Sequence, residues 1–194
     1  MVSDPTVRLL LLTCLLPLAA AVPRAAETEN LAERNLRRIV ERQKDVLAEA
    51  AKEGESLDEA ALKRRLQEIA HDYEVLLRDN PRYEAAYAAY GYLLSKVDMR
   101  KEASAMLLKA NELEPDIALV KNQLGNLLAE DGKPVQAASY FLAAIKLEPK
   151  EPLYHYQLGT LLVEGRDEFL KTGQWTRASL DAAVLEAFRQ ASEL

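Results

Sequence analysis

Cysteine is almost absent from this chain of 194 residues, because Cys14 is the only one. Cys14 lies inside an apolar run near the start, so cleavage of that run would leave a chain without any thiol. A chain without thiols forms no disulfide and cannot be a cysteine enzyme. We therefore expect packing alone to hold the fold together.

Histidine is nearly as scarce, with His71 and His155 the only two. Neither has a second ligand at the spacing of a metal-binding motif, so we expect His71 on a helix surface and His155 half-buried in the core. The sequence also lacks a glycine-rich phosphate loop and a Gly-x-Ser-x-Gly turn. It therefore predicts no catalytic residue, no metal site, no cofactor and no enzyme activity.

Positive charge is not in excess, since the formal net charge is −6. No cluster of lysine and arginine gathers enough charge to neutralise several phosphates, which disfavours nucleic-acid binding. Acidic substrates are equally disfavoured, and no small-molecule substrate is expected.

The main apolar run, residues 9–22 (LLLLTCLLPLAAAV), is short. As a helix it would reach about 21 Å, whereas a membrane core needs roughly 30 Å. Pro17 and the small residues Ala19 to Ala21 fit a processing site before Val22. We expect residues 1–21 to be a signal peptide of a periplasmic or secreted protein. An uncleaved membrane anchor and a buried helix are the alternatives, and Thr13 before Cys14 disfavours a lipoprotein signal.

Glycine and proline are few, 7 and 8, yet they are regularly placed. Three of each recur every 34 residues (125−91, 159−125; 115−81, 149−115): Gly91, Gly125 and Gly159, and Pro81, Pro115 and Pro149. The segments between them are rich in alanine and charged helix formers, and 49% of the chain is apolar. The pattern predicts an all-α fold of repeated helix–turn–helix units.

Residues 22–83 are predicted to form an irregular N-terminal helical hairpin cap. Helical apolar spacing runs over residues 28–52, Gly54 ends that helix, and Ser56 with Glu59 makes a capping box for the next. The second apolar stripe stops at Asn80 before a proline. A coiled coil is the competing interpretation, because the stripe is too short to decide.

The central part of the chain resembles the tetratricopeptide repeats. A unit starting at Glu84 places eight residues at the signature positions of that family: Tyr87, Tyr90, Gly91, Leu94, Ala103, Leu107, Ala110 and Pro115. A unit starting at Ala118 does the same: Lys121, Leu124, Gly125, Leu128, Ala137, Phe141, Ala144 and Pro149. Only Lys121, where the family prefers a large apolar residue, departs clearly. The resemblance implies repeats at residues 84–117 and 118–151, stacked in a right-handed superhelix, an α-solenoid with a concave groove.

Residues 152–194 are predicted to be a third repeat with an insertion. Its closing signature returns at Phe188 and Ala191, about 13 residues late. Residues 172–174 indicate a turn, and Thr176 is placed to cap the last helix. We expect both helices to be lengthened, with Phe169 and Trp175 near the tip. That aromatic pair is either a binding anchor or closes the tip against its own hairpin.

The resemblance also implies which residues line the groove. In the family these are the second, fifth, ninth and twelfth positions of each first helix, here Ala85, Ala88, Tyr92 and Ser95; Leu119, Asn122, Asn126 and Ala129; and Leu153, Tyr156, Thr160 and Val163. We select Tyr92, Asn122, Asn126, Tyr156 and Thr160 as the protein-binding residues. The two asparagine amides are expected to bond a peptide backbone or, equally, water. Ala88 stands where chaperone-binding members have a lysine, so that activity is not expected.

These observations predict an exported scaffold or adaptor that binds a protein or peptide segment in the envelope, with a membrane contact only if the signal is uncleaved. The alternative is the recognition arm of a longer envelope enzyme or assembly factor. The last residues, Ala191 to Leu194, parallel the ends of the two complete units, each of which is followed by Glu-Pro. We therefore expect either that the chain is a fragment of a longer protein or that another subunit covers its last apolar face.

Overall fold

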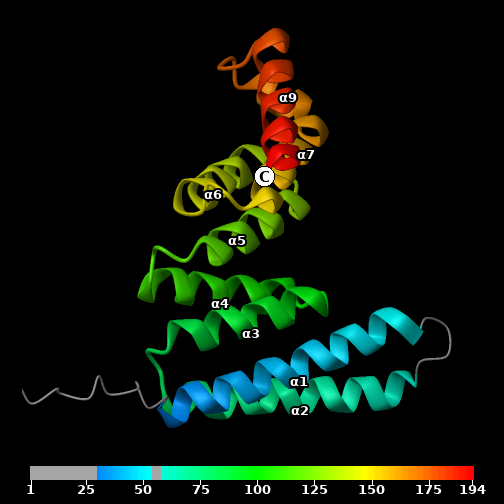
Figure 1. Ribbon diagram of the computed structural model, residues 1–194, viewed down its shortest axis with the longest axis vertical. Helices are drawn as coiled ribbons and strands as arrows, with labels where there is room; N and C mark the ends of the chain where they lie inside the picture. Colours follow the sequence, from blue (N-terminus) through cyan, green and yellow to red (C-terminus); the bar gives the residue numbers. More distant parts are fainter. Residues whose placement is uncertain (1–29, 54–57) are drawn as a thin grey trace, which may run out of the picture. The chain divides into compact units, whose positions relative to one another are not determined.

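The computed structural model of the protein describes residues 30–53 and 58–194 (Figure 1). All regular secondary structure in these ranges is helical, which confirms the predicted all-α fold. Among the same residues, no helix is both long and apolar enough to cross a membrane. The predicted signal peptide, residues 1–21, lies outside the described residues.

The first hairpin consists of α1 (Leu31–Glu53) and α2 (Glu59–Asp79), which pack against each other. Its core contains the buried side chains of Ile39, Val46 and Ile69. Tyr73 is fully buried, and its hydroxyl donates a hydrogen bond of 2.7 Å to Gln43 Oε1 on the facing helix. Buried polar atoms thus find their partners across the hairpin.

The predicted capping box is wrong. The N-cap of α2 is Asp58, whose carboxylate accepts the backbone N–H of Ala61 at 3.0 Å. Glu59 is consequently the first helical residue and not the third, and Ser56 lies outside the described residues. An aspartate is as good an N-cap as a serine, and it stands closer to the apolar stripe.

Two regular units follow, each beginning at the residue that the repeat pattern predicts. The first pairs α3 (Glu84–Lys96) with α4 (Arg100–Leu113), and the second pairs α5 (Ala118–Glu130) with α6 (Pro134–Leu147). In addition, α4 packs against α5, so successive units are in contact.

The recurring glycines set the distance between the two helices of each unit. A Cβ built on Gly91 would lie 2.7 Å from Leu107 Cγ, and one on Gly125 would lie 2.7 Å from Phe141 Cε1. In the third unit, a Cβ built on Gly159 would lie 3.0 Å from Phe188 Cε1. A Cβ at Gly91 or Gly125 would overlap the facing side chain, which would have to shift, and one at Gly159 would crowd it.

The third unit differs from its predicted form. It consists of α7 (Pro152–Glu164), α8 (Arg166–Lys171) and α9 (Arg177–Glu193). Only α9 is lengthened, to 17 residues against 14 in α4 and α6, whereas α7 has the 13 residues of α3 and α5. The insertion forms α8 instead, which packs against α6 and α7.

Gly165, between α7 and α8, lies against the preceding unit. A Cβ at Gly165 would come within 2.6 Å of Pro134 Cβ. Phe169 of α8 is only 2% exposed and meets Trp175 edge to face, with 6.2 Å between ring centroids. The aromatic pair therefore closes the tip and is not an exposed anchor. The predicted cap is confirmed, since Thr176 and Ser179 form a capping box at the start of α9.

Candidate binding face on the first helices of the repeats

The candidate site is the face carried by the first helices of the three repeats, α3, α5 and α7 (Figure 1). Helices α3 and α5 are in contact, and α5 is tied to α7 by a hydrogen bond of 3.1 Å from Gln157 Nε2 to Asn126 Oδ1. Because the helices begin in register, equivalent positions of successive units follow one another along this face.

Asn122 lies on α5 but does not reach the surface. Its side chain is 0% exposed, and neither Oδ1 nor Nδ2 has a hydrogen-bond partner in the structure. The prediction that this amide lies free in a groove is therefore wrong. Close packing of neighbouring helices covers the position, which a sequence pattern for one helix cannot reveal. A buried amide without partners instead costs stability.

Asn126 and Thr160 are both half-buried. The side-chain oxygen of Asn126 is already used, because it accepts the amide of Gln157. Gln157 in turn has a buried Oε1 without a partner. The polar part of the face is thus a bridge between two repeats rather than a row of free amides.

The two tyrosines of the candidate site differ in environment. Tyr92 is half-buried, and the ammonium of Lys96 lies 5.1 Å from its ring centroid, which is a cation–π contact. Tyr156 is 55% exposed and rests edge-on against Phe188, with 5.8 Å between centroids. Tyr156 therefore offers a ring that is held in place on one edge and open to a partner.

The most exposed positions of the face are apolar. Leu119, Leu153 and Val163 are 46%, 49% and 46% exposed, and each occupies a groove position implied by the repeat pattern. Together with Tyr156 they form what we call the apolar strip of α5 and α7. Of these four residues only Tyr156 was among the protein-binding residues selected from the sequence, whereas Leu119, Leu153 and Val163 were not.

Among the described residues, the groups with shifted pKa values include two core tyrosines and one ion-paired glutamate. Burial, followed by the charge of Glu74, raises the pKa of Tyr90 to about 12. Burial, followed by the charge of Glu148, raises the pKa of Tyr154 to about 12. Hydrogen bonds from Arg189, then from Gln190, lower the pKa of Glu186 to about 2. These shifts have structural causes, namely burial and ion pairing.

The two histidines lie apart from any ligand set. His71 is exposed on α2, as predicted. His155 is more deeply buried than predicted, at 9% exposure, and its Nε2 lies 2.9 Å from the carbonyl oxygen of Pro149. Within residues 30–53 and 58–194, no group of three or more histidine, cysteine and acidic side chains is arranged to hold a metal ion.

Comparison with known proteins identifies solved structures with a similar fold. No protein-family model matches the chain, and no curated protein matches its sequence. Among solved structures, a mutant O-GlcNAc transferase from Thermobaculum terrenum matches 83% of this chain with a TM-score of 0.60 and 17% identity. A double mutant of MamA RS-1 matches 84% of this chain with a TM-score of 0.56 and 21% identity, and covers 90% of that protein. A further MamA structure matches 84% of this chain with a TM-score of 0.56 and 16% identity.

These similar structures are tetratricopeptide-repeat proteins, and the chain has their helical-repeat fold. The resemblance read from the sequence is thus confirmed at the level of the fold. The chain corresponds to only 27% of the O-GlcNAc transferase chain. Helical-repeat scaffolds of this kind support protein–protein interaction in general.

Proposed function

We propose that this protein is an exported scaffold or adaptor, without catalytic activity of its own, that binds a segment of another protein along α3, α5 and α7. The observation that supports the proposal best is the apolar strip. Four large apolar side chains at groove positions, Leu119, Leu153, Tyr156 and Val163, are 46–55% exposed. Exposed large apolar side chains that gather on one set of helices are typical of an interaction site.

The chemistry of the strip suggests what the bound segment offers. Leucine, valine and tyrosine side chains gain free energy by burying apolar side chains, while the half-buried Thr160 supplies a hydroxyl for the backbone. We therefore expect a segment with alternating or helically spaced apolar residues, and not a strongly charged one.

The experiment is affinity capture with purified wild type and two matched variants. The groove variant is Leu153→Ala/Tyr156→Ala. The control variant is Leu108→Ala/Leu142→Ala, whose leucines are equally exposed, at 48% and 54%, but lie on the second helices α4 and α6. We expect the groove variant alone to lose the captured protein. Equal recovery with both variants would reject the apolar strip as the binding face.

The alternative is that these repeats serve as the recognition arm of a longer envelope enzyme or assembly factor. The similarity to one part of a much longer transferase chain favours it. A gene whose reading frame continues past the last repeat into a non-repeat domain would support this alternative over the free-standing scaffold.

Export itself is tested by N-terminal sequencing of the protein recovered from cells. Because Ala19 to Ala21 supply the small residues of a processing site, we expect the mature chain to begin at Val22. An intact Met1 on a membrane-bound protein would support the uncleaved anchor instead.

A further inference from the structure

Two cavities of the described structure occupy equivalent places in successive units. One, of about 380 Å³, lies between α2 and the C-terminal end of α3. The other, of about 510 Å³, lies between α4 and the C-terminal end of α5. Their walls match at the repeat spacing of 34 residues (104−70, 127−93, 128−94): Ala70 with Ser104, Leu93 with Leu127, and Leu94 with Leu128. Each cavity is therefore the junction between the second helix of one unit and the first helix of the next.

The next junction along the chain, between α6 and α7, is filled. The residues equivalent to those walls, again 34 further on (138−104, 161−127, 162−128), are Ala138, Leu161 and Leu162. They belong to one buried cluster with Phe169 of the inserted helix α8. Since α8 packs against both α6 and α7, the chain itself shows how such a junction is occupied: by a short helix that inserts a phenylalanine.

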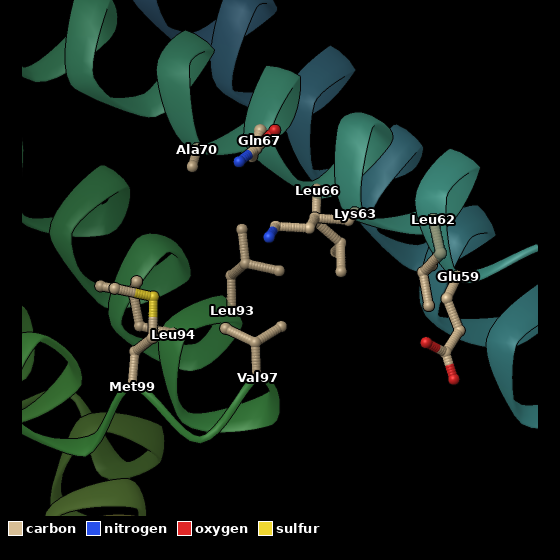
Figure 2. A pocket seen from close by; sticks show the side chains of 10 residues that line it. All are labelled: Glu59, Leu62, Lys63, Leu66, Gln67, Ala70, Leu93, Leu94, Val97 and Met99. Atoms are coloured by element: carbon tan, nitrogen blue, oxygen red, sulfur yellow. The ribbon is translucent and has the colours of Figure 1, made fainter.

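Of the two open junctions, the one between α2 and α3 resembles the filled α6–α7 junction more closely. Figure 2 shows Leu62, Leu66 and Ala70 of α2 across from Leu93 and Val97 on the α3 side. The α4–α5 junction is different at its rim, where Arg100 hydrogen-bonds Asp98 at 2.9 Å and pairs with Glu130 at 3.5 Å. A phenylalanine entering there would disturb charged groups, whereas the α2–α3 junction presents mainly apolar side chains.

Charge favours one kind of occupant. Figure 2 shows the ammonium of Lys63 extending toward the space next to Leu93, and among the described residues it has no ion-pair or hydrogen-bond partner. In α8, the phenylalanine is preceded directly by Asp167 and Glu168. A helix with the same acidic–phenylalanine order would place a carboxylate near Lys63.

We propose that the junction between α2 and α3 is a docking site for a short amphipathic helix of a partner protein. This helix inserts a phenylalanine against Ala70 and Leu93, as Phe169 inserts between α6 and α7, and places an acidic side chain beside Lys63. The site is separate from the apolar strip of α5 and α7, so its occupation does not depend on the function proposed above. Helix-in-groove recognition of this kind draws its affinity from one or two buried apolar side chains.

The test uses a synthetic peptide with the sequence of residues 164–173, EGRDEFLKTG, added to the isotope-labelled full chain and followed by amide chemical shifts in NMR spectra. We expect shifts concentrated in α2 and in the C-terminal half of α3. A peptide with alanine in place of the phenylalanine is expected to bind at least about tenfold more weakly, because it loses the buried ring. Absence of shifts at millimolar peptide, or equal binding of both peptides, would overturn the proposal.

Matched variants locate the site. Ala70→Phe fills the α2–α3 junction and is expected to weaken peptide binding at least about tenfold, by occupying the place of the inserted ring. Ser104→Phe makes the same change at the equivalent position of the α4–α5 junction and is expected to leave binding unchanged. Lys63→Glu should weaken binding by repelling the acidic residues. Far-UV circular dichroism and thermal melts confirm that each variant is folded.

Two results would show that the α2–α3 junction is not a docking site for a partner helix, and would reject the proposal. If Tyr156→Ala, on the apolar strip, removes the peptide shifts while Ala70→Phe does not, the peptide binds the other face. If the chain alone forms a dimer that Ala70→Phe dissociates in light scattering, the junction is covered by a second copy and not by a partner protein.

Discussion

At the scale of single residues, glycine is the side chain on which the repeat depends most directly. Gly125 leaves the space that the ring of Phe141 fills, and the helix pair closes only because no Cβ stands there. The 34-residue glycine spacing in the sequence is thus the trace of one interhelical contact repeated three times.

Gly125→Ala is expected to lower the free energy of unfolding by about 1–3 kcal/mol, because its new Cβ would overlap the ring of Phe141. The measurement is urea unfolding followed by circular dichroism. In a double-mutant cycle, adding Phe141→Ala should make the glycine substitution nearly neutral. Strictly additive effects would show that the cost arises from something other than this contact.

Asn122 is the clearest residue-scale departure from the sequence prediction. Both polar atoms of its amide are buried without partners. We expect Asn122→Leu to raise the free energy of unfolding by about 1 kcal/mol, since it replaces two unsatisfied polar groups by methyl groups in a side chain of the same branching.

Asn126→Leu is the matched control for that substitution, because it strips the amide of Gln157 of its acceptor and should lower the free energy of unfolding. Thermal melts of the two variants compare them directly. A destabilised Asn122→Leu protein would mean that the buried amide has a stabilising partner after all.

At the scale of helices, the contact of α2 with α3 is marked by two stacked tyrosines. The rings of Tyr73 and Tyr90 lie 5.1 Å apart with an interplanar angle of 14°. Burial raises the pKa of both hydroxyls above the ordinary value of 10.0, that of Tyr90 to about 12. The folded state therefore favours the neutral phenols.

This contact predicts a loss of stability at high pH. A raised pKa in the folded state gives a stabilising contribution that is complete below pH 10 and is lost as the pH rises from 10 through about 12. Thermal melts between pH 9 and 12 should show a steeper fall for wild type than for Tyr90→Phe, which keeps the ring and removes the ionising group. Parallel curves for the two proteins would contradict the prediction.

The inserted helix α8 packs against the preceding unit as well as against its own. The sequence indicated an insertion of about 13 residues and a turn near Gly173, and both are present. The approach of Gly165 to Pro134 and the packing of Phe169 in the junction are both contacts with the preceding unit. A contact between residues of different units leaves no signal in the periodicity of a single helix.

At the scale of the whole chain, we expect the local stability of each repeat to depend mainly on the repeats next to it. In repeat proteins each unit packs mainly against the next, so damage spreads only to adjacent units. Leu180 of α9 is fully buried. We expect Leu180→Ala to speed hydrogen exchange most in α7 and α9 and least in α3 and α4, as measured by mass spectrometry.

A uniform rise in exchange over all helices would contradict that prediction and show a single cooperative unit. Ala103, at 0% exposure in α4, provides the reciprocal control. Ala103→Leu should overpack the first repeat and speed exchange chiefly in α3 and α4, with little effect on α9.

The sequence by itself determined the all-α fold, the repeat length, and the first residues of α3, α5 and α7. It could do so because helical periodicity, proline stops and the glycine–aromatic contact each repeat locally. The repeat pattern also assigned Leu119, Leu153, Tyr156 and Val163 to groove positions, and the structure shows that all four are exposed.

Only the tertiary structure decided which of those positions are open. The side chain of Asn122 is buried, and the side-chain oxygen of Asn126 accepts a hydrogen bond from Gln157. The large apolar residues at the other groove positions of α5 and α7 remain exposed. It alone also showed that one junction between units is filled by Phe169 and another, beside Lys63, is open. The physical reason is that burial depends on the spacing of neighbouring units, whereas the pattern within a helix fixes only the direction in which a side chain points.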